Sequence, residues 1–349
     1  MNEKAGLYFH IPFCRNKCPY CDFYSVKYEP GASARYASQL AAEMRRWRDT
    51  DGVFAFDTVY FGGGTPSIVD PLQITGYLHL AREYFHVAKN SEITVECNPS
   101  KDLHIDLACY AKSGVNRISI GMQSAVDKER FALGRRAGSE DVARTVSFAR
   151  SAGIENISLD VMLGTPGQTL ASLEETFDFI DRMKVQHISA YMLKLEPGTK
   201  FYEMQGRLAL PDEDEVAEMY LKTVRTLEQL GLKQYEISNF ARPGYESRHN
   251  LKYWRLVPYL GIGKSAHSFW GGKRFYYDTD FRLVPDGDGG SDEERIMLGL
   301  RLTEGIEKSL VQKPYAQFIK MGLLRETDSR IALTPEGMLV SNTVINELI

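Results

Sequence analysis

The feature that most constrains the fold is a regular alternation of short β-rich runs with amphipathic segments through the first two thirds of the chain. This alternation is typical of βα units that build a parallel sheet. We expect helices to begin near Ala32, Pro71, Leu103, Ser139 and Thr169, with a further helix over residues 213–230. The expected strands are 7–10, 58–61, 92–96, 116–120, 157–162 and 187–193.

Polar or glycine-rich clusters directly follow each of the first five predicted strands. They begin at His10, Gly62, Glu96, Gly121 and Asp160. Chemistry gathered at the carboxyl ends of parallel strands is typical of α/β barrels. Because only six units are clear, we predict an α/β fold with a partial (β/α)6 TIM-like barrel over residues 1–234. A smaller C-terminal α+β domain is expected over residues 235–349.

Composition and charge exclude several classes of protein. Lysine plus arginine (42) against aspartate plus glutamate (46) gives a net charge of -4, without the basic excess of nucleic-acid-binding proteins. No apolar run approaches the roughly 18 residues that cross a bilayer, and no signal peptide is apparent. We therefore expect a cytoplasmic protein without a nucleic-acid partner. In that compartment five cysteines indicate metal or redox chemistry rather than disulfides.

Three of the cysteines, Cys14, Cys18 and Cys21, form a C-x3-C-x2-C motif just after the first predicted strand. Three thiolates on one loop can ligate three irons of a cubane cluster. A structural zinc ion is the alternative, but zinc usually takes a fourth ligand, and only His10 could be proposed for that role. We predict a 4Fe-4S cluster whose open fourth iron can chelate amino and carboxylate groups.

The run over residues 8–23 resembles the radical S-adenosylmethionine (SAM) superfamily, specifically its oxygen-independent coproporphyrinogen oxidase branch. This resemblance covers almost the whole chain. Heme-synthesis dehydrogenases of the branch carry C-x3-C-x2-C-x-C, with a cysteine where this chain has Phe23. They also have a longer segment before their first cysteine than the 13 residues that precede Cys14 here. Residues 249–254 match the H-N-x-x-Y-W signature of the related heme chaperones. Both departures favour the chaperones.

The resemblance also implies a SAM site. Gly63, Gly64 and Thr65 follow the second strand, where glycine lets a ligand approach the backbone closely, and this position receives the SAM amino group in the superfamily. Tyr8 matches a tyrosine beside the methionyl part of SAM. Arg135 could pair bidentately with the SAM carboxylate. Arg136 takes this role instead if the match to the family is shifted by one residue. The residues that match SAM contacts of the family one by one are Glu96, Gln123, Arg135 and Asp160.

Aromatic residues are dense between positions 235 and 281, where 12 of them occur. This density suits a large, flat, apolar ligand such as a porphyrin, although an aromatic core between two domains is the alternative. The resemblance favours heme binding, with His249 as the candidate axial ligand and His267 in reserve.

Two main functions follow from the resemblance. The first is a heme chaperone that binds heme and transfers it to apo-hemoproteins while carrying a SAM-coordinating 4Fe-4S cluster. The alternative is an oxygen-independent coproporphyrinogen III dehydrogenase, whose activity we expect to be absent here. A zinc-stabilised binding module is the third interpretation. An electron donor and a transient membrane contact remain open as further partners.

Overall fold

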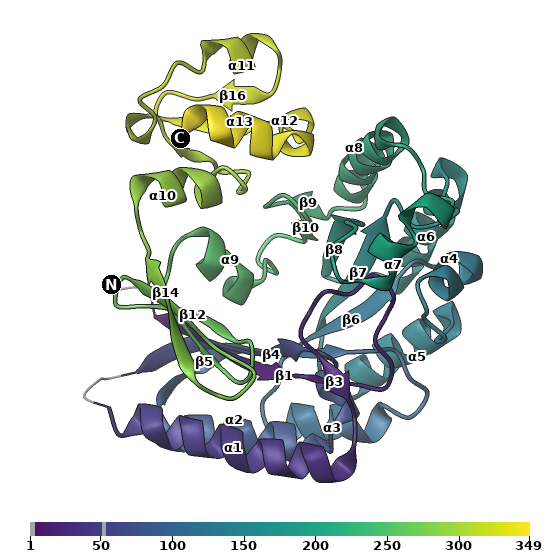
Figure 1. Ribbon diagram of the computed structural model, residues 1–349. Coiled ribbons are helices and arrows are strands. Elements are labelled where there is room, and N and C mark those ends of the chain that lie inside the picture. The colour runs from purple at the N-terminus through teal and green to yellow at the C-terminus, as the bar shows by residue number, and fades with distance from the viewer. Residues whose placement is uncertain (1–3, 51–53) are drawn as a thin grey trace.

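The structure is a computed structural model that describes residues 4–50 and 54–349, and a curved twelve-stranded sheet forms its centre (Figure 1). The strands follow the order β14-β13-β12-β11-β1-β4-β5-β6-β7-β8-β10-β9. From β11 to β8 every neighbouring pair is parallel. Within the described residues the two edges of the sheet do not pair, so this is a partial barrel. Its parallel strands are β1 (Ala5–Ile11), β4 (Ala55–Gly63), β5 (His86–Cys97), β6 (Arg117–Gln123), β7 (Asn156–Leu163), β8 (His187–Met192) and β11 (Tyr259–Ile262).

Helices pack on the outer face of the curved sheet (Figure 1). Several of them begin where a side chain accepts a hydrogen bond from a backbone N–H of the first turn, which is the usual N-cap, as two examples illustrate. Asp70 accepts from Leu72 at 2.9 Å, and Thr169 accepts from Ser172 at 3.1 Å. The outer helices are α1 (Pro30–Arg48), α2 (Pro71–Tyr84), α3 (His104–Lys112), α4 (Asp127–Ala132), α5 (Ser139–Ser151), α6 (Leu170–Met183) and α8 (Glu213–Gln229). The short helix α7 (Lys200–Glu203) instead lies against the cysteine loop, where the Phe201 N–H donates to the Pro19 carbonyl at 2.9 Å.

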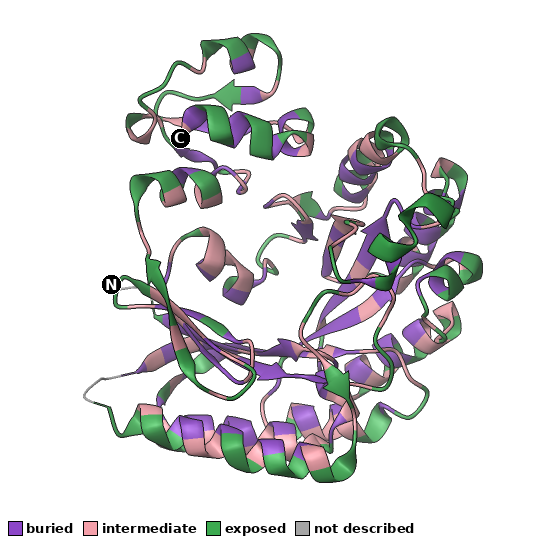
Figure 2. Cartoon of the chain, in the orientation of Figure 1, coloured by how far each residue is buried: buried purple, intermediate pink, exposed green. Residues whose placement is uncertain are grey.

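The two faces of the sheet differ in polarity because side chains alternate along each strand. In β6, Ile118 and Ile120 are fully buried in the main hydrophobic core, whereas Arg117 and Ser119 occupy the alternate, inner positions. Figure 2 shows the buried strands between partly exposed helices. The inner positions of the neighbouring strands are also largely polar: Thr58 and Tyr60, Thr94 and Glu96, Ser158 and Asp160, His187 and Ser189.

Residues beyond 234 complete this same sheet. Strand β11 pairs in parallel with β1, and helix α9 (Arg248–Trp254) lies inside the curve (Figure 1). Strands from both sides of the predicted boundary at residue 234 therefore belong to one sheet, and independent folding of 235–349 stays a prediction. The other strands added here are β9 (Lys233–Gln234), β10 (Asn239–Ala241), β12 (His267–Trp270), β13 (Lys273–Tyr277) and β14 (Leu283–Asp288).

A small mixed unit follows at the C-terminal end, drawn in yellow and light green in Figure 1. Its three-stranded antiparallel sheet has the order β15-β17-β16. Its elements are α10 (Asp292–Gly299), β15 (Ile306–Glu307), α11 (Ala316–Lys320), β16 (Leu324–Glu326), β17 (Arg330–Leu333), α12 (Pro335–Leu339) and α13 (Ser341–Leu348).

The predicted α/β fold is confirmed, and all six predicted strands and the helices between them are present. The main difference is that β5 begins at His86 rather than near residue 92. The first part of β5 carries the exposed Lys89 and Asn90, and a register shift opposite Phe56 and Thr58 separates it from the rest of the strand. The alternation of apolar and polar residues is therefore not visible in this part. Among residues 4–50 and 54–349, none of the helices combines the length and apolarity needed to span a bilayer.

Candidate functional site

The three motif cysteines lie on a loop whose two ends are held together. Strand β2 (Phe13–Cys14) pairs in parallel with β3 (Val26–Lys27). The Val26 N–H donates to the Pro12 carbonyl at 2.6 Å, and the Tyr28 N–H donates to the Cys14 carbonyl at 2.9 Å. These bonds close the loop at its base, so its thiols stay together at the carboxyl end of β1.

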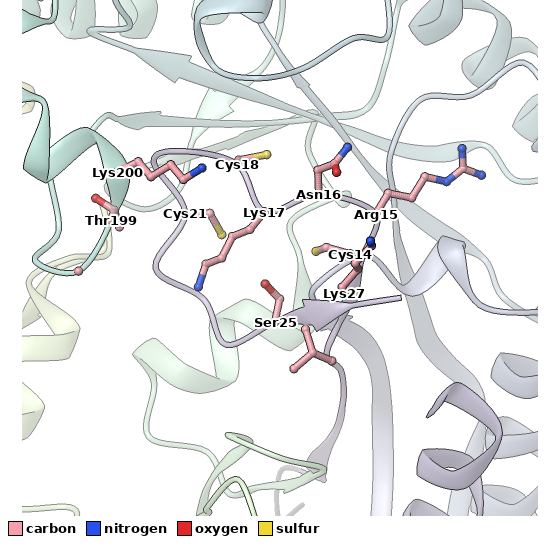
Figure 3. Close-up of a pocket in the computed structure, with 12 residues that line it drawn as sticks. Cys14, Arg15, Asn16, Lys17, Cys18, Cys21, Ser25, Lys27, Thr199 and Lys200 are labelled. Carbon is pink, nitrogen blue, oxygen red and sulfur yellow. The ribbon is translucent and has the colours of Figure 1, made fainter. Parts of the chain in front are cut away.

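The thiols of Cys14, Cys18 and Cys21 all line one open cavity of about 490 Å³ (Figure 3). None of them forms a disulfide. Burial raises the pKa of the Cys21 thiol, and Cys18 and Cys14 add to this increase, which shows that the three groups interact. Lys17 and Lys200 also border this cavity, and their positive charges favour thiolates.

The donor set can be compared with the group that the motif predicts. Three thiols on one loop line a single cavity, and a cubane takes its thiolates on separate irons. The donor set therefore fits the 4Fe-4S cluster predicted from the motif. Across the described ranges 4–50 and 54–349, no three His, Cys, Asp or Glu groups lie close enough to hold a single metal ion.

A second cavity, of about 330 Å³, extends from the same cysteines toward the inner face of the sheet. It unites residues from five successive parallel strands, β4 to β8, and from the loops that follow them. The structure therefore brings together most of the side chains predicted from the sequence. The predicted residues in its lining are Cys14, Cys18, Cys21, Gly63, Gly64, Thr65, Glu96, Gln123, Arg135 and Asp160.

Two glycines shape the wall between the cysteine loop and β4. Gly63 has φ +111, a conformation that L-residues rarely adopt, and a Cβ there would lie 2.6 Å from the His10 ring. A Cβ on Gly64 would lie 2.7 Å from the Phe13 carbonyl oxygen. Beside them, the Thr65 hydroxyl lies 3.6 Å from Cys14 Sγ. The absence of side chains here lets the backbone approach both the loop and a ligand.

Two carboxyl groups face the cavity with raised pKa values. Burial, reinforced by Asp160, raises the pKa of Glu96 to about 7, although the Tyr60 hydroxyl donates to it at 2.9 Å. Burial also raises the pKa of Asp160 to about 6, against a hydrogen bond from Ser119 at 3.0 Å. A positively charged ligand would favour ionisation of both groups. The pair is therefore suited to an ammonium or sulfonium group.

Gln123 and Arg135 close another side of the cavity. Gln123 has φ 70 and is the residue at the end of β6, and its side-chain carbonyl accepts a hydrogen bond from Tyr191 at 2.7 Å. A non-glycine residue in this region is uncommon and points to a functional constraint. Arg135 donates from Nη2 and Nε to the Tyr20 hydroxyl at 3.0 and 3.3 Å, and from Nη1 to Asn98.

Tyr8 and His249 do not border this cavity. The Tyr8 hydroxyl lies 3.1 Å from His10 Nδ1. His249 is fully buried, with Nδ1 2.7 Å from the Thr58 hydroxyl and Nε2 2.9 Å from that of Tyr253. Burial, aided by Lys252, lowers the pKa of His249 to about 3. His249 is therefore a neutral residue that fixes α9 to the sheet, and in this conformation no ring nitrogen is open to iron.

The reserve candidate, His267, has a different setting. It is exposed on β12, and its ring stacks on Tyr276 with centroids 5.1 Å apart. Within the part of the chain that the structure describes, no hydrogen bond involves its ring nitrogens. His267 is therefore the more accessible of the two histidines.

The sequence reasoning missed several residues of the cavity. Asn98 lies in the polar cluster that begins at Glu96, and nothing in the sequence assigns it a role. Arg117 and Ser119 alternate with Ile118 and Ile120 in β6, and this period of two could have identified them as inner-face residues. The missed members of the lining include Tyr20, Tyr60, Asn98, Arg117, Ser119, Ser189, Tyr191 and Asn250.

Comparison with known proteins agrees with this site. Residues 8–180 match the radical SAM superfamily, and residues 293–340 match the HemN C-terminal domain. The chain is 34% identical to the heme chaperone HemW of Bacillus subtilis, with 97% of each chain covered. It is 32% identical to HemW of Synechocystis, over 99% of this chain and 96% of the relative. Coproporphyrinogen III oxidase (HemN) from Escherichia coli shares the fold, with a TM-score of 0.83 at 20% identity, covering 99% of this chain and 90% of that one.

Proposed function

Because this chain belongs to the radical SAM superfamily and, within it, to the HemW family, we propose that it is a heme chaperone. In this role it binds heme and transfers it to apo-hemoproteins, and it carries a 4Fe-4S cluster that coordinates SAM. The observation that carries the proposal is the full-length similarity to HemW, together with retention of residues 249–254 as one helix inside the barrel.

In this proposal Cys14, Cys18 and Cys21 hold the cluster at the mouth of the inner cavity. When bound, the cluster supplies one-electron chemistry and a site that chelates an amino acid. Gly63 and Gly64 leave room for the amino end of SAM. The other cavity residues serve as partners for its polar groups, with Glu96 and Asp160 as the anionic partners of its positive charges.

Heme is the cargo in this proposal, and the two histidines have different roles. His249 positions α9 through Thr58 and Tyr253. His267 is the accessible candidate for the axial ligand, because a neutral imidazole with an open nitrogen binds iron readily. Its stacking partner Tyr276 offers an aromatic surface for a macrocycle.

Phe23 is the residue that separates the proposal from the alternative of coproporphyrinogen III dehydrogenase. It stands where the dehydrogenases carry an additional cysteine, it is 65% exposed, and it borders the inner cavity. An exposed phenylalanine beside the cysteine loop can neither ligate iron nor transfer a proton. This favours binding and delivery over decarboxylation.

The proposal is tested with two parallel reactions of the anaerobically reconstituted protein. In the first, heme is added, its Soret band is followed, and heme is then offered to an excess of an apo-hemoprotein. In the second, coproporphyrinogen III is supplied with SAM and a reductant. We expect heme binding and transfer in the first reaction and no protoporphyrinogen IX in the second. Product in the second reaction, or no heme binding in the first, would overturn the proposal.

A further inference from the structure

Arg117 is a buried cation without a partner. The residue is 1% exposed at the start of β6, and it borders the inner cavity. Its Nε atom is buried and has no hydrogen-bond partner. Among the hydrogen bonds and ion pairs of residues 4–50 and 54–349, none involves the Arg117 guanidinium. Buried charges are normally paired, because removing an isolated charge from water is costly.

Two carboxyl groups of the same cavity do not fill the role of partner. Arg117 is close enough to Glu96 and Asp160 to lower the pKa of each carboxyl, after burial has raised it. Yet neither carboxylate lies within ion-pair distance of it. Glu96 is bonded to Tyr60, and Asp160 is bonded to Ser119. The guanidinium therefore retains its donors for a group that enters from the cavity.

The other arginine of the cavity is already committed. Arg135 uses all three of its side-chain nitrogens to donate to Tyr20 and Asn98. Three of the five N–H groups of Arg135 are therefore in use, whereas Arg117 has all five available to a carboxylate that enters the cavity. A free guanidinium presents two parallel donors that match the two oxygens of a carboxylate.

Two further polar groups lack partners or border the same cavity. Thr94 lies directly opposite Arg117 in the register of β5 and β6, and its fully buried hydroxyl also has no hydrogen-bond partner. Asn250, the second residue of the H-N-x-x-Y-W signature, borders the cavity together with Arg117. The cavity wall therefore combines a cation with a neutral polar group.

We propose that Arg117 anchors a carboxylate of the ligand held in the inner cavity. The proposal rests on the proposed function for the identity of the ligand. Two ligands named there carry carboxylates: SAM at its amino acid end and heme on its propionates. The shared chemistry is a carboxylate, and the experiment separates the two sources.

The test compares each ligand with a version that lacks the free carboxylate. Binding of SAM and decarboxylated SAM, and of heme and heme dimethyl ester, is measured on the full-length, cluster-loaded protein and on its Arg117→Met and Arg117→Lys variants. The measured quantity is the ratio of affinities for a ligand with and without its free carboxylate. For either the SAM pair or the heme pair, Arg117→Met should lower this ratio by about ten- to a hundredfold. The ratio for Arg117→Lys should lie between those of the parent and Arg117→Met, because lysine keeps the positive charge but lacks the two parallel donors of a guanidinium.

Thermal unfolding of the ligand-free variants separates this role from a structural one. Because the guanidinium has no partner to lose, Arg117→Met should melt at the same temperature as the parent or higher. Marked destabilisation, or unchanged preferences in both pairs, would overturn the inference while leaving the proposed function intact. If the parent bound neither SAM nor heme, the inference would fall together with the proposed function.

Discussion

The Nε2 atom of His249 lies 2.9 Å from the hydroxyl oxygen of Tyr253, one helical turn away in α9. Both residues belong to the H-N-x-x-Y-W signature, so two of its defining side chains are hydrogen-bonded to each other. The opposite ring nitrogen of His249 bonds to Thr58, which ties the helix to β4. These two signature residues therefore have a structural role in the barrel. Replacing them should first of all lower the stability of the fold.

We accordingly expect His249→Ala to lower the free energy of unfolding by roughly 2–4 kcal/mol, because it removes buried hydrogen bonds and leaves a cavity. His267→Ala should leave stability unchanged, because its ring is exposed, but should weaken heme binding and alter the Soret band. Chemical denaturation and heme titration measure the two effects. A normal Soret band in His267→Ala with an altered one in folded His249→Ala would return the ligand role to His249.

Replacing any one of Cys14, Cys18 and Cys21 with serine should abolish a stable 4Fe-4S cluster, because each thiol supplies one iron ligand. Cys97 and Cys109 are the matched controls, since neither belongs to the motif. Burial raises the pKa of Cys97 to about 12, so it remains a thiol. Iron and sulfide content and the EPR signal of the reduced protein give the result. A full cluster in Cys18→Ser would contradict the assignment.

SAM should bind more tightly as pH rises from about 6 to about 8. Burial raises the pKa of Glu96 to about 7, so the group changes from neutral to ionised across this interval, and only the ionised form attracts a positive charge. Calorimetric titration of the cluster-loaded protein at several pH values measures the trend, which should vanish in Glu96→Gln. Asp160→Asn should move the trend to lower pH, because the charge of Asp160 helps to raise the pKa of Glu96.

Without ligand, the effect of pH on stability has the opposite sign. The folded-state pKa of Glu96 lies above its ordinary value, so folding favours the protonated carboxyl. The contribution to stability is full below about pH 4.5 and is lost as pH rises through about 7. Glu96→Gln should therefore show less loss of stability than the parent over this range. Equal slopes for the two proteins would show that Glu96 is ionised throughout.

Arg135→Ala should accelerate loss of iron from the cluster, because Arg135 holds Tyr20, which lies between Cys18 and Cys21. Groups that orient metal ligands typically change metal affinity by about 10- to 100-fold when removed. Tyr20→Phe is the matched variant, since it retains the ring and removes only the hydroxyl that Arg135 contacts. Iron release to a chelator should be faster in both variants. Normal release in both would limit Arg135 to ligand binding.

Gly63→Ala should destabilise the protein more than Gly153→Ala. Both glycines have positive φ, +111 and +90, so each alanine carries a similar backbone cost of about 1–2 kcal/mol. A Cβ at 153 meets nothing within 4 Å, whereas one at 63 lies 2.6 Å from His10. The His10 ring is fixed by Tyr8 and Tyr24 and cannot yield easily. Urea unfolding compares the two, and equal losses would show that the contact relaxes.

The parts of the site predicted from the sequence are those where one strand and the loop after it carry the signal. The cysteine motif, the Gly62–Gly64 run and Glu96 each follow a strand with clear alternation. Parallel packing then brings the carboxyl ends of these strands together without further information. The gathering of these residues at one end of the sheet could therefore be predicted.

The parts that could not be predicted depend on contacts between distant segments. Nothing local to His249 indicates that Thr58, 191 positions earlier, will occupy its Nδ1 atom. Likewise Arg135 meets Tyr20 across 115 positions, and this contact occupies two of its N–H donors. Whether a polar side chain is available to a ligand is decided by its partners, and these become visible only in three dimensions.

The pairing of β11 with β1 sets an order of events during synthesis. Until residues 259–262 leave the ribosome, β1 is the edge of the growing sheet, with an unpaired row of backbone groups beside the cysteine loop. Helix α9, which packs against Gly6 of the same strand, also emerges late. At translation rates of about 5–20 residues per second, this delay lasts on the order of ten seconds or more. The nascent chain therefore has its cysteines long before it has a finished barrel, and cluster insertion into the mature site must follow synthesis of most of the protein.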